Sequence, residues 1–345
     1  MTRLILEDGT VFVGRGFGSL SDSYGEIVFT TSMSGYLESI TDPSYRGQIL
    51  VFAFPTIANY PLSKGSMESD RAQVAGVITM DSHHSLSHGG FPDPFSDFLK
   101  KSGVPGIDGI DTRSLVRKIR ENGVLRAWIS QGEEDLDFKR DPTDRDLWKE
   151  CIHDRIYEIK NTKSDRKMLF IDTGAKRSLI TRMSEVSSLS VYPYNESFPD
   201  SGYDAIFISN GPGDPKSKYL RNVVKFISEN IGKKKIYGVC LGQQIISLAY
   251  GAKTYKMKFG HRGTNHAVTD GSRVWITSHN HGYAVDYESA KSSGLKVERW
   301  DANDNTPEML SDQEEMFCVQ YHPEASPGPN DTLTFFDLIK KKVDS

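Results

Sequence analysis

The sequence predicts an α/β protein with two domains: a mixed α/β N-terminal domain and a C-terminal domain built on a doubly wound, mostly parallel sheet. The chain has 345 residues, about twice a usual domain length. Its second half alternates short apolar runs with helical patterns, which indicates parallel strands covered by helices on both faces. A highly charged segment separates the halves. We therefore expect domains at residues 1–130 and 167–345, joined by a charged connector at 131–166.

The N-terminal domain opens with strand signals. Residues 4–6 and 11–13 are apolar runs on either side of an Asp-Gly turn, which predicts a hairpin. Residues 25–31 and 48–54 read as further strands, and the second of these is an apolar run of buried type.

A helix is predicted near the end of this domain. Asp111 or Thr112 can cap its start and Gly123 can end it. Beyond it, twenty of the 37 residues at 131–167 are charged, as expected of a solvated connector. We expect a short helix within this stretch, around 147–156.

The C-terminal domain shows apolar runs of strand length at residues 168–172, 204–209 and 235–239. In sheets of this kind, ligands bind at the carboxyl ends of the strands. The side chains that follow these runs are therefore the candidates for function.

Cys240 follows the third run directly, in the motif Gly238-Val239-Cys240-Leu241-Gly242. A helical pattern over 243–250 comes next, so the motif resembles a nucleophile elbow with sulfur in place of a hydroxyl. The helix N-terminus favours the thiolate. The alternative is a buried core cysteine, the usual fate of an isolated one. We expect that structural role for Cys151 and Cys318, which lack such a context.

A thiolate nucleophile needs a base, and the base needs an orienting acceptor. His322 ends the apolar run 317–321, which places it at the carboxyl edge of a strand, and Glu324 follows at a distance that reaches its ring. Alone, His322 is equally well explained as a surface-loop histidine. With Glu324 beside it, the catalytic interpretation is favoured, and the predicted triad is Cys240, His322 and Glu324.

No metal site is expected from the other histidines. One polar stretch suggests ligands, but its Gly and Ser neighbours favour a loop; it contains Asp81, His83, His84 and His88. His279 and His281 are placed on a loop that lines the pocket without ligating anything, and His261 and His266 stay unassigned.

The glycine turn at 210–215 matches neither GxGxxG nor a P-loop. It is either a plain turn or part of an oxyanion site, in which the backbone N–H groups of Gly213 and Leu241 point at a developing negative charge. Because no P-loop or kinase-type glycine loop occurs elsewhere, we expect this chain not to use ATP by itself through those folds.

Composition excludes several classes. The net charge of −4 argues against nucleic-acid binding through bulk positive charge. The longest apolar run is about six residues against the roughly 18 of a membrane helix, and an early acidic pair argues against a signal peptide, so a cytoplasmic location without membrane association is expected. Three cysteines without a CxxC pair argue against a disulfide framework and exclude a zinc site built on paired thiols.

Two motifs carry a resemblance. Residues 237–244 and His322-Pro323-Glu324 resemble the elbow and the His-Pro-Glu of class I glutamine amidotransferases. Further segments resemble the small-subunit family of carbamoyl phosphate synthetase, over nearly the whole chain; they are residues 41–45, 109–113, 251–254, 256–263, 280–283 and 323–329.

The resemblance implies roles for further residues. It implies a pocket for L-glutamine formed by Ser44, Gly211, Gly213, Leu241, Gln244, Asn280, Gly282 and Tyr283. The chain departs from the family's usual residues at Gln243, His279, Tyr283 and Pro61, none of which is a triad member.

The function implied is glutamine hydrolysis through a Cys240 thioester, with ammonia passed to the large subunit of a heterodimer. No cofactor is expected in this chain, and ATP and Mg would be used by the large subunit, whose product feeds arginine and pyrimidine biosynthesis. The N-terminal domain, which has no nucleophile constellation, would serve assembly. Two alternatives are an amidotransferase subunit of another biosynthetic synthase and a regulatory subunit with a vestigial triad.

Overall fold

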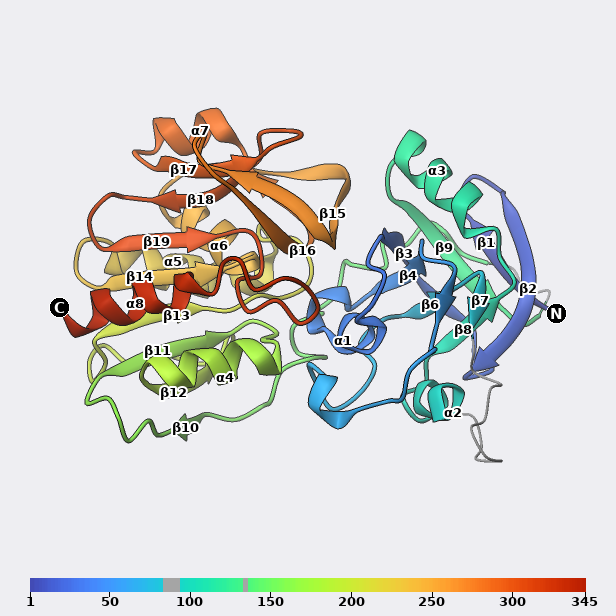
Figure 1. Ribbon diagram of the computed structural model, residues 1–345, viewed down its shortest axis with the longest axis horizontal. Coiled ribbons are helices and arrows are strands. Elements are labelled where there is room, and N and C mark those ends of the chain that lie inside the picture. The colour runs from blue at the N-terminus through green and yellow to red at the C-terminus, as the bar shows by residue number, and fades with distance from the viewer. Residues whose placement is uncertain (83–93, 133–135) are drawn as a thin grey trace. The chain divides into compact units, whose positions relative to one another are not determined.

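The protein, represented by a computed structural model, is described over residues 1–82, 94–132 and 136–345. It divides into two units, Met1–Leu147 and Trp148–Ser345 (Figure 1). The division falls inside the charged stretch 131–166. His83, His84 and His88 lie outside the described residues. None of the described helices is long and apolar enough to cross a membrane.

The helix expected around 147–156 is not formed, and that prediction is wrong. These residues make turns, with the Cys151 N–H donating to the Trp148 carbonyl at 3.0 Å. Trp148 is 1% exposed and its ring lies 6.2 Å from those of both Tyr194 and Tyr219. The chain turns here because this large ring is inserted into the core.

The first unit is built on a closed barrel of seven strands in the order β1-β2-β8-β6-β4-β3-β9. The β3-β4, β4-β6 and β6-β8 pairs are parallel and the other pairs antiparallel. The barrel strands are β1 (Thr2–Leu6), β2 (Val11–Gly18), β3 (Ser23–Thr30), β4 (Gln48–Phe52), β6 (Gly76–Ile78), β8 (Pro105–Asp108) and β9 (Leu125–Ser130). The predicted hairpin is β1-β2, and the two predicted strands are β3 and β4.

Helices and short elements complete this unit. They are α1 (Tyr36–Thr41), α2 (Pro94–Lys101), α3 (Thr112–Asn122), the paired strands β5 (Thr56–Ile57) and β7 (Asp81–Ser82), and the 3₁₀ turns η1 (Pro43–Tyr45) and η2 (Lys64–Ser66). Helix α3 has the predicted ends. Asp111 accepts a hydrogen bond from the Ser114 N–H at 2.9 Å, and Gly123 has a φ of 94°.

The second unit contains a sheet of ten strands, ordered β10-β12-β11-β13-β14-β19-β18-β17-β15-β16. The central strands β12-β11-β13-β14-β19 are parallel, whereas every other pairing is antiparallel. The sheet is therefore mixed rather than mostly parallel. Its strands are β10 (Tyr157–Ile159), β11 (Lys167–Asp172), β12 (Ser188–Pro193), β13 (Ala205–Ile208), β14 (Lys235–Val239), β15 (Thr254–Thr269), β16 (Val274–Val285), β17 (Lys296–Asp301), β18 (Pro307–Ser311) and β19 (Met316–Val319).

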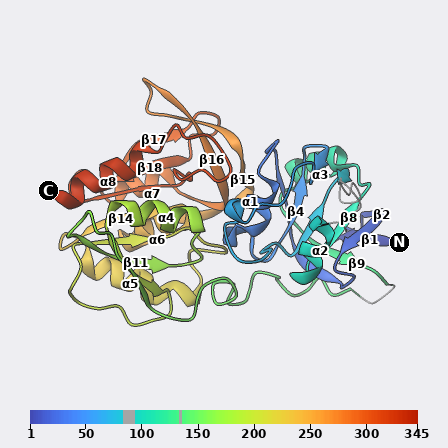
Figure 2. The same ribbon diagram turned by 60° about the horizontal axis from the view of Figure 1, so that its bottom comes forward.

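Helices cover both faces of the parallel part. Alternate side chains of β11 enter two different cores: Leu169 and Ile171 pack with α5 and α6, whereas Met168 and Phe170 pack with α4 and α8. Figures 1 and 2 show these helix pairs on opposite sides of the sheet. The helices of this unit are α4 (Arg177–Val186), η4 (Lys218–Leu220), α5 (Arg221–Asn230), α6 (Leu241–Ala249), α7 (Tyr287–Ser292) and α8 (Thr334–Asp344).

The antiparallel hairpin β15-β16 corrects one expectation. His279, Asn280 and His281 lie on strand β16 and not on a loop. The facing strand β15 is rich in Gly, Lys and His, and its register shifts twice along the pair. Neither strand shows a clear apolar alternation, which is the signal that predicts strands.

Candidate active site

Cys240 lies at the turn between β14 and α6, where the motif predicts it. It immediately precedes Leu241, the first residue of α6. The φ of 56° and ψ of −107° at Cys240 are uncommon for residues other than glycine. The flanking glycines are required by close packing. A Cβ on Gly238 would lie 2.9 Å from the Gly242 carbonyl carbon, and one on Gly242 would lie 2.3 Å from the Ile208 carbonyl oxygen. The sequence therefore makes an elbow that places the sulfur at a strand end.

His322 follows β19, the strand adjacent to β14. Its backbone N–H donates to the Ser278 carbonyl at 2.8 Å, which ties the residue to β16. Its Nδ1 lies 2.7 Å from Glu324 Oε1, and both residues are buried. The predicted orienting contact is therefore present, and Nε2 is the ring nitrogen left to exchange a proton.

The sulfur and the imidazole belong to one electrostatic unit. Burial opposes the charged ring of His322, but the Glu324 carboxylate and the Cys240 thiol outweigh it and raise the pKa of His322 to about 10. Cys240 is 2% exposed, and its Sγ lies 3.6 Å from the Asn280 carbonyl oxygen. A protonated imidazole beside a sulfur nucleophile suits acyl transfer.

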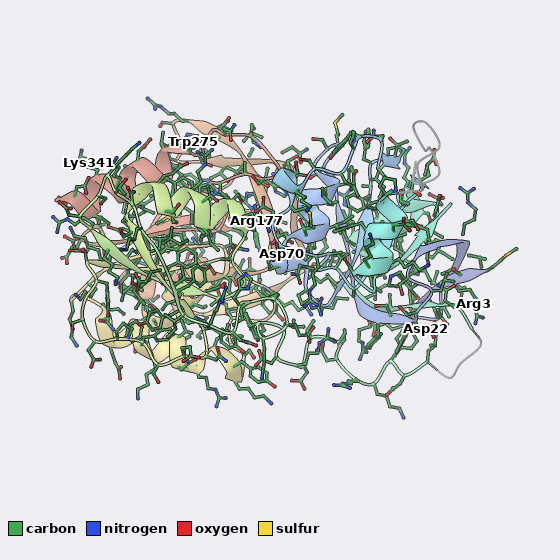
Figure 3. All side chains as sticks on the ribbon, turned by 90° about the horizontal axis from the view of Figure 1, so that it is seen from below. Arg3, Asp22, Asp70, Arg177, Trp275 and Lys341 are labelled. Atoms are coloured by element: carbon green, nitrogen blue, oxygen red, sulfur yellow. The ribbon has the colours of Figure 1, made fainter. Side chains whose placement is uncertain are left out.

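Lys176 is a member of this site that sequence reasoning missed. Its Nζ lies 3.0 Å from Glu324 Oε1 and donates to the Ala325 carbonyl, and the side chain is 2% exposed. Burial raises the pKa of Glu324, but Lys176 and His322 hold it down at about 2. Lys176 immediately precedes Arg177, the first residue of α4, labelled in Figure 3. No motif singled it out, because lysines are usually exposed.

The other cysteines lie in structural positions. Cys318 on β19 is fully buried, its thiol lies 3.8 Å from the Leu310 carbonyl oxygen, and burial raises the pKa of this thiol far above its ordinary value. The Cys151 thiol lies 3.3 Å from the Trp148 carbonyl oxygen.

Several residues predicted to bind glutamine lie on the elements around the elbow. Leu241 and Gln244 are in the first turns of α6, and Asn280, Gly282 and Tyr283 are on β16. Both donors of the Gln244 amide are used internally, one by the Tyr283 carbonyl at 2.8 Å and one by Gln320 Oε1 at 2.9 Å. Only its carbonyl oxygen remains for a ligand.

The glycine turn after β13 packs against the loop after β11. A Cβ on Gly211 would lie 1.9 Å from the Thr173 carbonyl oxygen, so only glycine fits there, and Gly213 has φ of 81°. Ser44 is a residue of η1 in the first unit, buried, with its N–H donating to Asp42 at 2.9 Å. Its contribution to a glutamine pocket stays a prediction.

Two family matches cover most of the chain. Residues 4–129 match "Carbamoyl-phosphate synthase small chain, CPSase domain", and residues 169–342 match "Glutamine amidotransferase class-I". A solved glutamine amidotransferase from Thermotoga maritima aligns with 52% of this chain and 85% of its own, at 14% identity and a TM-score of 0.39, too low to support any conclusion.

Curated relatives match over nearly the full length. The carbamoyl phosphate synthase small chain of Thermoplasma volcanium is 54% identical, covering 99% of this chain and 98% of its own. That of Thermoplasma acidophilum is 53% identical, covering 99% and 97%, and that of Caldanaerobacter subterraneus subsp. tengcongensis is 41% identical, covering 97% and 94%. With its elbow, its buried histidine–glutamate pair and these matches, the chain belongs to the carbamoyl phosphate synthase small chain family and carries the class I glutamine amidotransferase domain of that family.

Proposed function

We propose that this subunit hydrolyses L-glutamine through a thioester on Cys240 and delivers the ammonia to a large subunit. One observation carries the mechanism. Cys240, in a strained backbone conformation at the elbow, interacts with the His322 imidazole, and the buried Glu324 carboxylate holds that imidazole at 2.7 Å. This arrangement supplies a nucleophile, a proton carrier and an orienting group.

In the first half-reaction the Cys240 thiolate attacks the side-chain amide carbon of glutamine. The carbon–nitrogen bond breaks as the His322 imidazolium gives its proton to the leaving nitrogen, so ammonia departs and a glutamyl thioester remains. The backbone N–H groups of Gly213 and Leu241 would stabilise the oxyanion, each by about 3 kcal/mol.

In the second half-reaction, His322 takes a proton from water as the oxygen attacks the thioester carbon. The carbon–sulfur bond breaks, glutamate leaves, and the thiolate–imidazolium pair returns. Glu324 stabilises the charged ring throughout, and Lys176 stabilises Glu324. The balance is glutamine and water giving glutamate and ammonia.

The proposed glutamine site combines the turn at Gly211 and Gly213 with Leu241 and the residues around it. Its further members are Gln244, Asn280, Gly282 and Tyr283, and Ser44 by resemblance. Ammonia in neutral water is mostly protonated and then not nucleophilic, so a sealed route to a partner suits this chemistry.

The proposed partner is the carbamoyl phosphate synthase large subunit, in a heterodimer. ATP and Mg would be used there, and carbamoyl phosphate would supply arginine and pyrimidine synthesis. A reducing compartment, the cytoplasm, suits a reaction that needs a free thiol, and Cys240 is in no disulfide.

The test uses the assembled complex with Cys240→Ser. Glutamine-supported synthesis of carbamoyl phosphate should collapse, while synthesis from an ammonium salt should persist, because only the ammonia supply is removed. Cys151→Ala is the matched control and should keep both activities. Loss of both activities in Cys240→Ser would contradict the proposal, as would a comparable loss of glutamine-supported synthesis in the control.

A labelling experiment addresses the remaining alternative, a vestigial triad. A glutamine-like diazo-ketone should attach to Cys240 in the complex, and mass spectrometry of peptides locates the adduct. If Cys240 stays unlabelled, the triad is not a working nucleophilic site.

A further inference from the structure

We propose that the second unit holds a divalent transition-metal ion of the Zn²⁺ class between His261, His279, His281 and Glu308. These side chains come from strands β15, β16 and β18. All four are buried, with 0 to 7% exposed, and their ligand atoms lie within 4.8 Å of one another. The ion is distinct from the glutaminase machinery, and sequence reasoning assigned none of these residues to a metal.

The hydrogen bonds of His281 determine which ring nitrogen can bind an ion. Its Nδ1 lies 2.9 Å from the Tyr283 carbonyl oxygen, which can only accept. Nδ1 therefore carries the hydrogen, and in the neutral ring Nε2 carries a lone pair.

The contacts of His279 are compatible with the same arrangement. The Thr277 hydroxyl lies 3.0 Å from the His266 carbonyl oxygen and 2.7 Å from His279 Nε2, and when its hydrogen goes to the carbonyl its oxygen accepts from His279 Nε2. In that tautomer His279 Nδ1 carries the lone pair. It lies 3.1 Å from His281 Nε2. With lone pairs on both nitrogens, this separation is unfavourable unless a cation lies between them.

Glu308 supplies the independent indication of a missing cation. It is 0% exposed, and neither carboxylate oxygen has a hydrogen-bond partner among the described residues. Oε2 lies 3.7 Å from His279 Nδ1 and Oε1 lies 3.9 Å from His261 Nδ1. A fully buried carboxylate at these distances from its imidazole neighbours is costly, and an ion shared among them would offset that cost.

His261 completes the set. Its Nε2 lies 2.9 Å from Asp304 Oδ2, while its Nδ1 has no partner among the described residues. This is the carboxylate–histidine arrangement that orients metal-binding imidazoles and raises their basicity. All three histidines thus have the outer nitrogen fixed and the inner nitrogen directed at the same space.

The dimensions and the chemistry favour zinc. Bond lengths of 2.0–2.2 Å in a tetrahedral site put neighbouring ligand atoms about 3.3 Å apart. The separations of 3.1, 3.7 and 3.9 Å therefore need only small side-chain shifts. Three imidazoles and a carboxylate suit Zn²⁺ better than Mg²⁺ or Ca²⁺, which prefer oxygen.

The charges around the site also favour a divalent ion. Asp301 Oδ2 lies 4.0 Å from His261 Nδ1 and 3.5 Å from His266 Nδ1, so Asp301, Asp304 and Glu308 bring three carboxylates together. The guanidinium of the buried Arg262 donates to the Phe259 carbonyl. It is a positive charge close enough to His281 to affect the pKa of that ring.

The ion would have a structural role. Four protein ligands fill a tetrahedral zinc site and leave no position for substrate. Asn280, whose carbonyl contacts the Cys240 sulfur, lies between ligands His279 and His281. The Tyr283 carbonyl accepts from both His281 and Gln244. The ion would therefore fix the part of β16 that lines the elbow.

The test begins with the full chain carrying no histidine tag. After chelator treatment, reloading with ZnCl₂ and desalting, elemental analysis should find about one Zn²⁺ per chain. Thermal unfolding should show a higher Tm for the loaded than for the stripped chain. A zinc content near zero together with an unchanged Tm would overturn the proposal. This measurement on the unsubstituted chain does not depend on whether any variant folds.

Variants then locate the ion. Glu308→Gln and His279→Gln should each lower zinc content at least fivefold, whereas His153→Gln, at an exposed histidine, should keep about one equivalent. Cys240→Ser should also keep it. If zinc is lost with Cys240→Ser, or if the Co²⁺-loaded chain shows sulfur-to-cobalt charge transfer, the ion sits on the catalytic thiol and the proposed site is wrong.

Discussion

The second unit contains two groups of buried side chains built around histidine. The first group is His322 with Glu324, and the second is His261, His279 and His281 with Glu308. They differ in what lies next to the second ring nitrogen. A carboxylate holds one ring nitrogen of both His322 and His261. A hydroxyl and a backbone carbonyl contact the corresponding nitrogens of His279 and His281. The second nitrogen of His322 is left for the Cys240 thiol, whereas Nδ1 of His279 and Nε2 of His281 lie 3.1 Å from each other.

This difference teaches how one side chain serves two purposes. Beside a thiol, an imidazole oriented by a carboxylate suits proton transfer. Where imidazole nitrogens and the buried Glu308 carboxylate converge, the same ring suits an ion. The partner of the second nitrogen decides the role.

The largest effect is expected from a substitution of His322, in the first group. His322→Gln removes the proton carrier and should lower glutamine hydrolysis by the complex about a thousandfold. Ammonia-supported synthesis should stay near normal, and zinc content should stay unchanged because His322 is not a ligand. Loss of ammonia-supported synthesis would mean that the substitution disturbs more than proton transfer.

The second prediction concerns pH. The pKa of His322, raised to about 10, keeps the ring charged through neutral pH, so glutamine hydrolysis should fall on the alkaline side near pH 10. The raised value also means that this ring adds stability below about pH 6.5, which is lost as pH rises toward 10. The pH profile of kcat/KM measures this alkaline fall in activity. A fall centred near pH 6.5 would contradict the proposed thiolate–imidazolium pair.

The third prediction concerns Lys176→Met, which sharpens the comparison by removing a charge from the first group alone. Leaving Glu324 with one cationic partner should destabilise the chain by roughly 3 kcal/mol. Lys176 lowers the pKa of both Glu324 and His322, so both should rise, and the acid limb of the activity profile should move toward neutral pH. A lower Tm with unmoved limbs would indicate packing alone.

The smallest expected effect lies in the first unit and serves as a reference. Asp111→Ala removes the cap of α3 and should cost about 1 kcal/mol of stability. It touches neither histidine group, so the pH profile and the zinc content should both match those of the unsubstituted chain. A change in either would show that the two groups respond to general destabilisation.

How much was predictable depends on the kind of signal. The elbow, the histidine after β19 and the cap of α3 are local: each depends on a few neighbouring residues with strong conformational preferences, such as Gly238, Gly242 and Gly123. These predictions place the elements correctly. The closure of the barrel could not be predicted, because it depends on the pairing of β1 with β9. These two segments lie far apart in the sequence, and no local pattern predicts that they pair.

The strands β15 and β16 of the second unit were not predicted, for a related reason. Strands β15 and β16 lack the apolar alternation that reveals a strand, so the sequence predicts a loop for His279 and His281 and assigns no role to His261 and His266. Lys176 and Glu308 were missed because their roles exist only after folding, when residues far apart in sequence converge. Burial of a charged group is not visible in sequence.

The left-handed backbone at Cys240 has a consequence for how this chain tolerates change. A side chain at φ of 56° holds roughly 1–3 kcal/mol of conformational strain that glycine would not. Replacing the nucleophile by glycine could therefore yield a sturdier chain that does no chemistry. At this position durability and turnover favour different amino acids, and only selection for turnover keeps the sulfur there.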